Sequence, residues 1–220
     1  MNSAQEQLNS AFRTPKKAGR IRQQNEAKIL QAAEIEFALN GYKGTSLNAV
    51  ADRANLPKSN ILYYFKSKLG LYGVLLADIL ELWNHVFSNA TVNDDPKEVL
   101  SVYIEEKMKY SQTNPLASRI FAMEIIQGAP YLKKFLSEDL KEWIDDRSKV
   151  FYGWIEAGKI KEIDPNHLIF VMWGATQHYA DFATQIQWVL GREELTEEDF
   201  ATATKTIKTL VLGGLGLDQD

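Results

Sequence analysis

The apolar residues near the start of the chain recur at intervals of three and four positions, the spacing of an amphipathic helix. The stripe includes Ile29, Ala33 and Phe37. Asn40-Gly41 follows it, and both residue types tolerate the left-handed backbone that ends helices. The pattern therefore predicts a helix that begins near residue 25 and ends at this pair.

Two short helices are predicted next. The hydroxyl of Thr45 offers an N-cap for the first, whose apolar stripe follows directly. Residues 55–57, Asn-Leu-Pro, interrupt the pattern, and a second short helix is expected over 58–65. Helix, tight turn and helix within about twenty residues predict a helix-turn-helix over 45–64.

The remaining two thirds of the chain carry repeated helix start signals. Asx-Pro pairs at 95–96, 114–115 and 164–165 each place an N-cap before a first-turn proline. We expect one helix of about 28 residues between Pro130 and Gly158 and a break between the last two helices at 191–196. Few runs alternate with period two, so we predict an all-α fold of about nine helices.

Charge is distributed unevenly along the chain. Residues 1–70 hold 11 Lys+Arg and 5 Asp+Glu, whereas residues 71–220 hold 14 and 24, so the overall charge of −4 is the sum of two opposite excesses. The positive first third favours a polyanionic partner. Cysteine is absent, which excludes disulfides, thiolate metal sites and cysteine nucleophiles. Without a long apolar run or signal core, we expect a cytoplasmic protein.

These patterns divide the chain into three parts. Residues 1–22 are polar and basic, and we expect a disordered arm that either neutralises phosphates or only aids solubility. With its positive charge and helix-turn-helix pattern, the segment 23–83 is expected to be a DNA-binding domain of three helices. Residues 84–220 are expected to form a second helical domain, for ligand binding and dimerisation.

The predicted second helix of the turn carries side chains suited to DNA. Lys58 offers a charge to phosphate, Ser59 and Asn60 reach base edges, and Tyr63 and Tyr64 offer hydroxyls to phosphate or flat faces to thymine methyl groups. The alternative is that the two tyrosines belong to an aromatic patch of the core. The basic residues around them favour the DNA-binding interpretation. The apolar positions expected to attach this helix to its scaffold are Ile61, Leu62 and Phe65.

The same region matches a known signature at fixed spacing. The matching residues are Gly44-Thr45-Ser46-Leu47, Val50-Ala51, Ala54, Leu56, Leu62-Tyr63-Tyr64-Phe65 and Ser67-Lys68. They resemble the helix-turn-helix of TetR-family transcriptional regulators. The resemblance implies that Thr45 caps the helix before the turn and contacts a phosphate. Pro57 departs from the family, which usually has a Ser or Thr cap there, so the phosphate contact of that cap is missing.

The resemblance also implies roles for the side chains of the second helix. Tyr63, Tyr64 and Lys68 would bind the DNA backbone, and Lys58 and Asn60 would read bases. It implies a homodimer on double-stranded DNA, at a near-palindromic operator whose half-sites lie about 34 Å apart.

The second domain resembles the ligand domain of pyrimidine-responsive members of the family. The matching segments are 118–124, which includes Met123, 128–130, 158–159, 163–165 and 176–183. The resemblance implies uracil or thymine as effector. A sister regulator on the same scaffold, sensing a different small molecule, is the alternative.

The residues themselves favour a small polar ligand. Trp173, Gln177 and Asp181 fall within 80° on one helix face, which combines an indole, an amide and a carboxylate. A flat heterocycle would stack on Trp173 or Trp83 and exchange hydrogen bonds with Gln177. In the alternative, Gln177 and Asp181 only satisfy neighbouring helices.

The opposite face of this helix has small residues that permit close helix approach. Gly174, His178 and Phe182 lie there, and with the final helix, 200–212, they form the predicted dimer face. An ordinary core helix is the alternative.

Two other classes compete with a DNA-binding repressor that needs no metal or cofactor. An enzyme would use His178 beside Asp181, or His85 or His167 with nearby acids, but no metal-binding pair, phosphate loop or nucleophile motif accompanies them. We therefore expect no catalysis. A helical adaptor would explain the acidic second part and leave the basic helix-turn-helix unexplained.

Overall fold

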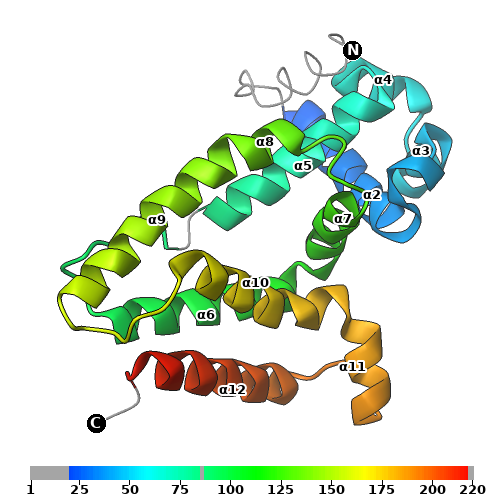
Figure 1. The fold of residues 1–220 in the computed structure, drawn as a ribbon. Helices are drawn as coiled ribbons and strands as arrows, with labels where there is room; N and C mark the ends of the chain where they lie inside the picture. Colours follow the sequence, from blue (N-terminus) through cyan, green and yellow to red (C-terminus); the bar gives the residue numbers. More distant parts are fainter. Residues whose placement is uncertain (1–19, 85–86, 218–220) are drawn as a thin grey trace. The chain divides into compact units, whose positions relative to one another are not determined.

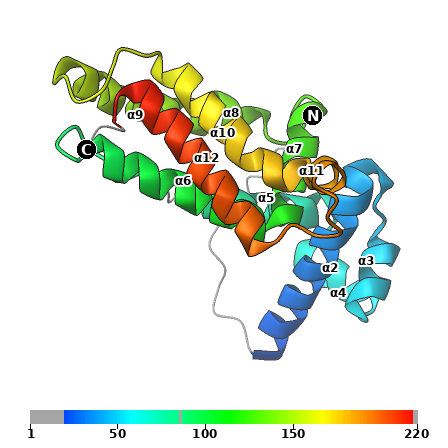
Figure 2. The same cartoon turned by 90° about the horizontal axis from the view of Figure 1, so that it is seen from below.

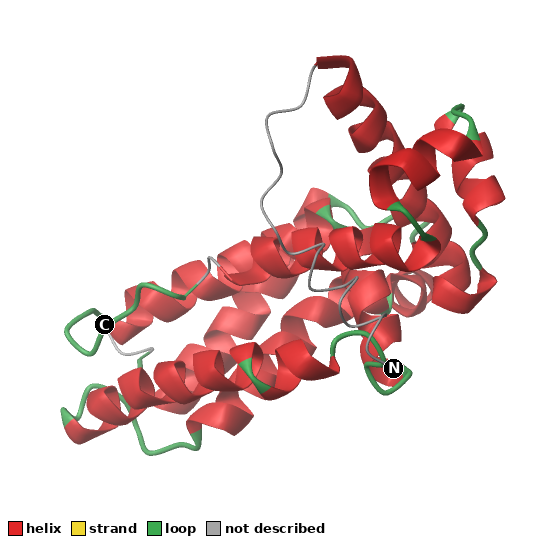
Figure 3. Ribbon diagram, turned by 90° about the horizontal axis from the view of Figure 1, so that it is seen from above, coloured by secondary structure: helices red, strands yellow, loops and turns green. Residues whose placement is uncertain are grey.

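Every regular element of the described residues, 20–84 and 87–217 in a computed structural model, is a helix (Figure 3). These residues divide into two units. Unit 1 consists of the residues up to Trp83 together with Arg119–Leu132, and unit 2 of Asn84–Ser118 and the residues from Lys133 onward. The predicted all-α class is confirmed, with eleven helices in the described part of the chain rather than about nine.

Unit 1 holds the N-terminal helices (Figure 1). α2 packs on α3, and α3 packs on α4. The bounds are α2, Arg20–Gly44; α3, Leu47–Ala54; α4, Lys58–Phe65; α5, Lys68–Asn84; and α7, Pro115–Ile126, whose residues from Arg119 onward belong to this unit.

Backbone geometry at the ends of these helices follows the sequence signals. Gly41 has φ 66° and ψ 177°, so regular helical backbone is interrupted at the predicted pair. Asn55 adopts the left-handed conformation at the C-cap of α3, as an Asn tolerates. Gly70 permits close packing of α5 on the end of α4, because a Cβ there would lie 2.1 Å from the carbonyl oxygen of Phe65.

The core of unit 1 fixes the orientation of α4. Its members come from α2, α4 and α5 and are almost wholly buried: Ile29, Phe37, Ile61, Leu71 and Leu76. Ile61 and Phe65 thus attach α4 as predicted, whereas Leu62 is 42% exposed and does not. Burial of two of the three expected positions leaves the opposite face of α4 open to solvent.

Unit 2 is built around three long helices that pack on one another, α6, α10 and α12 (Figure 2). α9 also packs on α10, and the short α8 packs on α9. The bounds are α6, Pro96–Thr113; α8, Lys133–Ser137; α9, Asp139–Glu156; α10, Pro165–Asp181; α11, Ala183–Leu190; and α12, Glu197–Leu215.

Two of the three predicted Asx-Pro caps are confirmed, and α7 begins at Pro115 as expected without a cap bond from Asn114. Asp95 accepts a hydrogen bond from the backbone of Lys97 at 2.8 Å, and Asp164 accepts one from His167 at 3.0 Å. Thr196 caps α12 and exchanges hydrogen bonds with Asp199 in a capping box. Each cap satisfies first-turn N–H groups that lack partners inside the helix.

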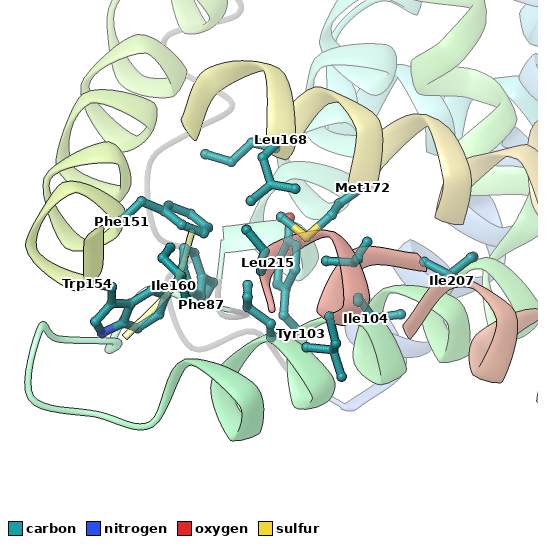
Figure 4. Close-up of a cluster of buried hydrophobic side chains, with 14 of the residues drawn as sticks. Phe87, Tyr103, Ile104, Phe151, Trp154, Ile160, Leu168, Met172, Ile207 and Leu215 are labelled. Atoms are coloured by element: carbon teal, nitrogen blue, oxygen red, sulfur yellow. The ribbon is translucent and has the colours of Figure 1, made fainter. Parts of the chain in front are cut away.

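An aromatic and aliphatic core joins the helices of unit 2 (Figure 4). Phe87 lies among Tyr103, Phe151 and Trp154, with ring centroids 5.3 to 6.3 Å apart. Met172 of α10 and neighbouring apolar residues of α12 continue this core. The inward faces of α6, α9, α10 and α12 are therefore fixed by one packed cluster.

Some predicted boundaries are wrong. The expected helix of about 28 residues is two helices, because α8 ends at Ser137 and α9 begins at Asp139. α2 begins at Arg20, so the last three residues of the predicted arm, 20–22, are helical, and residues 1–19 lie outside the described residues. Arg119–Leu132 groups with the N-terminal helices, which the proposed division at residue 83 does not include.

Within the described ranges, the apolar stretches of the helices are too short or too interrupted by charge to pass through a bilayer.

Candidate DNA-binding helix and ligand site

α3, the turn after it and α4 form the predicted helix-turn-helix. Pro57 is the N-cap residue of α4 and makes no side-chain cap bond, as its departure from the expected Ser or Thr implies. Lys58 and Ser59 are exposed in the first turn of α4, and Asn60 is half-buried. Tyr63 is 65% exposed, which rules out a core position for it.

Tyr64 has a mixed environment. It is half-buried, its hydroxyl accepts a hydrogen bond from the side-chain amide of Asn25 at 3.4 Å, and the Arg22 guanidinium lies 5.7 Å from its ring centroid. These contacts tie α4 to the first turns of α2. Tyr64 therefore combines a structural contact with the surface position predicted for it.

The assignment of Thr45 as N-cap is wrong. Ser46 is the N-cap of α3, and its Oγ accepts a hydrogen bond from the backbone of Ala49 at 3.1 Å. Thr45 is 2% exposed, and its hydroxyl is directed to the carbonyl oxygens of Glu36 and Gly41 at 2.9 and 2.8 Å. A buried hydroxyl with these partners cannot also contact a phosphate, so Thr45 joins α3 to α2 instead.

Lys68 also takes part in this connection. Its Nζ donates to the carbonyl oxygen of Thr45 at 2.6 Å and to that of Lys43 at 3.4 Å, and it lies 4.6 Å from the ring centroid of Tyr42. Burial lowers the pKa of Lys68. Lys68 thus stabilises backbone carbonyls at the end of α2 and just after it, and its contact with DNA stays a prediction.

A buried carboxylate fixes α3 on α2. The sequence analysis did not identify it. Glu36 lies on the apolar face of α2 and is 8% exposed. Its Oε1 is 2.7 Å from Nε of Arg53, and its Oε2 accepts a hydrogen bond from Asn40. A Glu within an apolar stripe is the signal that was available in the sequence, since such a carboxylate needs a partner.

The predicted ligand residues of unit 2 lie on α10. Nε1 of Trp173 donates to the hydroxyl of Tyr103 at 2.6 Å, and its ring stacks with that of Trp143 at 6.1 Å. Gln177 and Asp181 follow at one-turn spacing and are half-buried. Met123 belongs to unit 1, and the side chain of Trp83 lies outside the described residues.

Three polar residues missed in the sequence belong with this α10 face. Ser118 is buried, and its Oγ donates to Oδ1 of Asp181 at 2.6 Å. Ser111 is buried and donates to the carbonyl oxygen of Thr176 at 2.9 Å. Lys107 is 6% exposed on the face of α6 that holds Tyr103. A lysine in the apolar stripe of that helix was the available signal.

Burial and charge oppose each other at Lys107. Burial lowers the pKa of Lys107 to about 8, and the charge of Asp181 acts in the raising direction. Such an ammonium stays mostly protonated at neutral pH. A buried cation and a half-buried carboxylate therefore share the region where α6 and α10 pack.

The second half of α7 ends in another buried carboxylate, in unit 1. Glu124 is 3% exposed and accepts hydrogen bonds from the Tyr72 hydroxyl at 3.1 Å and the Tyr131 backbone at 2.6 Å. Burial raises the pKa of Glu124 and, with the nearby carboxylate, that of Tyr72. Tyr42, Tyr72 and Tyr131 pack with ring centroids 4.6 to 5.6 Å apart. α7 is thereby anchored to α2 and α5.

The predicted dimer residues lie toward the end of α10. Gly174 is exposed, and a Cβ on it would meet no other atom within 4 Å. His178 is half-buried and stacks on Phe182, with ring centroids 5.0 Å apart. Phe182 is the C-cap residue of α10 and is 51% exposed.

Two family models cover this chain. "Bacterial regulatory proteins, tetR family" matches residues 29–75, and "YcdC-like protein, C-terminal region" matches residues 76–218. The chain belongs to the TetR family. The first match contains α3 and α4, and the second contains α6 to α12.

Relatives of this TetR-family regulator are themselves named as transcriptional regulators. The transcriptional regulator RutR of Escherichia coli K12 is 38% identical over 205 residues, which are 93% of this chain and 97% of RutR. The uncharacterised regulator YhgD of Bacillus subtilis is 27% identical over 66% of this chain and 76% of its own length. The chain is thus a TetR-family transcriptional regulator similar to RutR.

Solved structures of low sequence identity share the fold. A putative fatty acid metabolism regulator from Clostridium perfringens is 22% identical with a TM-score of 0.64, covering 86% of this chain and 98% of its own. The fatty acid degradation regulator FadR from Bacillus halodurans is 20% identical with a TM-score of 0.65, covering 91% and 98%. At such identities the likeness concerns the fold of the TetR regulator alone.

Two of the histidines considered for catalysis pack against aromatic rings. His167 lies beside Phe170, and His178 stacks on Phe182. Within residues 20–84 and 87–217, no three His, Asp or Glu side chains are placed to hold a metal ion together. His85 lies outside the described residues.

Ser46→Ala tests the corrected cap of this TetR regulator. We expect a loss of about 1 kcal/mol in the free energy of unfolding, because one first-turn N–H of α3 loses its acceptor. Urea denaturation followed by circular dichroism measures it. Ser59→Ala is the matched control, since Ser59 is exposed in the next helix. Equal stability of both variants and the parent chain would contradict the cap.

Proposed function

We propose that the chain is a repressor of an operon for pyrimidine catabolism or nitrogen scavenging. It binds its operator through α4 and leaves it when uracil or thymine binds the second domain. The observation that carries the proposal is the open face of α4: Lys58, Ser59 and Tyr63 are exposed while Ile61 and Phe65 hold the helix from behind. Side chains held in this way suit the major groove.

The α10 face supports a small heterocyclic effector. Trp173, Gln177 and Asp181 supply an aromatic ring, an amide that both donates and accepts, and a carboxylate. The run 176–183 resembles pyrimidine-responsive members of the family, which favours uracil or thymine over other heterocycles. The proposal requires no metal or cofactor, and it places the regulator in the cytoplasm.

α7 supplies a route from effector to DNA-binding helix. In unit 2 its Ser118 donates to Asp181, and in unit 1 its Glu124 is held by Tyr72 and Tyr131. A ligand that competes for Asp181 would release Ser118 and change the position that α7 prefers. Effector and operator then weaken each other's binding by the same factor.

The proposed operator needs two copies of α4, hence a homodimer. Phe170 and Val171 of α10, Phe182 at its C-cap and Leu210 of α12 are exposed. Apolar side chains at these positions favour a dimer face formed by α10 and α12. Light scattering at micromolar concentration should give twice the mass of the chain, and a monomer would contradict this part of the proposal.

The experiment is a fluorescence-anisotropy titration with an operator fragment selected from random duplex DNA. We expect tight binding that weakens steeply with salt, and a loss of affinity of about 10-fold or more at saturating uracil or thymine. Absence of salt-sensitive binding to any selected fragment would contradict the DNA-binding function. Binding that neither pyrimidine changes at millimolar concentration, with no rise in melting temperature, would contradict the effector.

A further inference from the structure

A groove of about 740 Å³ lies between α6 and α12, two helices of unit 2 that pack side by side (Figure 2). Its volume is within the range of about 300–1,000 Å³ that small-molecule sites occupy. Residues of both helices line it, so its shape is set by their packing. The groove is therefore large enough for a small organic ligand.

The groove has an apolar floor. Met108 of α6 and Leu212 of α12 are 2% and 8% exposed, and both contribute to the lining. Phe200 adds a half-buried aromatic ring, whose centroid lies 6.1 Å from that of Tyr179 on α10. Aromatic rings favour stacked or edge-to-face contact with one another. The floor therefore suits a ligand with a flat aromatic body.

The rim of the groove is positively charged, although acids outnumber bases in residues 71–220 as a whole. Four lysines and two glutamates line the groove: Lys97, Lys109, Lys205, Lys208, Glu105 and Glu197. Lys208 forms an ion pair with Glu105. Lys109 and Lys205 are exposed, one on each helix, and neither has an ion-pair partner among the described residues. The rim therefore favours an anion.

The groove is separate from the α10 face proposed for the pyrimidine and from the apolar face proposed for the dimer. Gln112 of the groove and Tyr103, which accepts the hydrogen bond of Trp173, are nine positions apart on α6, about 180° around the helix. Ala201 of the groove and the exposed Leu210 have the same separation on α12. A ligand in the groove would leave both other faces accessible.

We propose that this groove is a second ligand site, for a small organic anion with an aromatic body. The ring lies on the apolar floor, and the anionic group pairs with Lys109 and Lys205. An uncharged aromatic molecule gains only the contact with the floor, and an inorganic anion gains only the contact with the lysines. The proposal does not depend on the pyrimidine effector, which is uncharged and is placed on another face.

Lysines that only aid solubility make a different prediction. The apolar floor would then bind charged and uncharged rings equally, and removal of the lysines would change nothing. If the lysines pair with the ligand, their removal must abolish the preference for the anion and leave the affinity for the uncharged ring as it was. The difference between two ligands therefore separates the two roles.

The test compares naphthoate with naphthamide, the uncharged amide of the same ring, by isothermal titration calorimetry on the full chain. We expect the parent chain to prefer naphthoate by about 5-fold or more at low salt, as two exposed ion pairs imply, and less at high salt. Lys109→Gln combined with Lys205→Gln should abolish this preference. Lys133→Gln combined with Lys161→Gln removes the same charge at exposed sites outside the groove and should preserve it.

Saturating uracil provides a further check, because it should leave naphthoate bound. Displacement of naphthoate by uracil would place both in one site and overturn the proposal. Failure of the parent chain to bind either naphthalene would also overturn it, as would a preference that survives in the groove variant or disappears equally in both double variants. Circular dichroism checks that the variants fold. None of these outcomes changes the expected binding of DNA or of uracil.

Discussion

Lys58→Glu is expected to weaken operator binding by about 100-fold or more, because one lost DNA contact costs about 1–3 kcal/mol and the dimer carries the change twice. Lys58 is the first residue of α4 and is exposed. Reversal of its charge also replaces attraction to the DNA by repulsion.

Anisotropy titrations at several salt concentrations measure the effect. The salt dependence should become shallower, because fewer counterions leave the DNA when a cation is replaced by an anion. Lys133→Glu is the matched control, since Lys133 is an exposed lysine at the first position of α8 in unit 2. If both variants weaken binding equally, the effect reflects net charge and α4 is not the recognition helix.

Trp154→Ala is expected to lower the free energy of unfolding of unit 2 by about 3–5 kcal/mol, the cost of a large cavity in a packed core. Trp154 is fully buried between Phe87 and Phe151. Its indole N–H has no hydrogen-bond partner among the described residues. Trp154→Phe keeps most of the aromatic contact and removes that unsatisfied donor, so it should cost clearly less.

Urea denaturation followed by far-ultraviolet circular dichroism tests this order. The two units need not unfold together, so the curves are fitted for the transition of unit 2. Tyr152→Ala is the control, because Tyr152 is a half-exposed aromatic residue of the same helix. A loss for Trp154→Phe as large as that for Trp154→Ala would contradict this order, because it would mean that the phenyl ring recovers none of the packing of the indole.

Most helix starts were predictable because local chemistry determines them. Asp95, Asp164 and Thr196 cap their helices through bonds to residues two or three positions away, and α4 spans the predicted 58–65. A cap is formed within one turn, so its signal is complete in the sequence. The same holds for the left-handed Asn55.

The errors concern features that tertiary contacts decide. Thr45 and Ser46 are adjacent hydroxyl residues, and only the packing of α3 on α2 determines which is buried and which caps the helix. The break after Ser137 has neither Pro nor Gly, and packing of α8 on α9 accompanies it.

The candidate ligand site was predictable only in part. The helical period placed Trp173, Gln177 and Asp181 on one face, but the partners of that face come from α6, α7 and α9. Lys107 lies 74 positions before Asp181, and Ser118 lies 63 positions before it. No local pattern connects residues so far apart in the chain.

Two tryptophans differ strongly in solvent exposure, so the intrinsic fluorescence of the protein can report on what covers its surface. Trp188 of α11 is 82% exposed, whereas Trp154 is fully buried. An exposed indole emits at longer wavelength and is accessible to a dissolved quencher such as iodide, while a buried one is shielded. Anything that covers α11, including a second copy of the chain, should therefore be visible as a loss of quenching in the unlabelled protein.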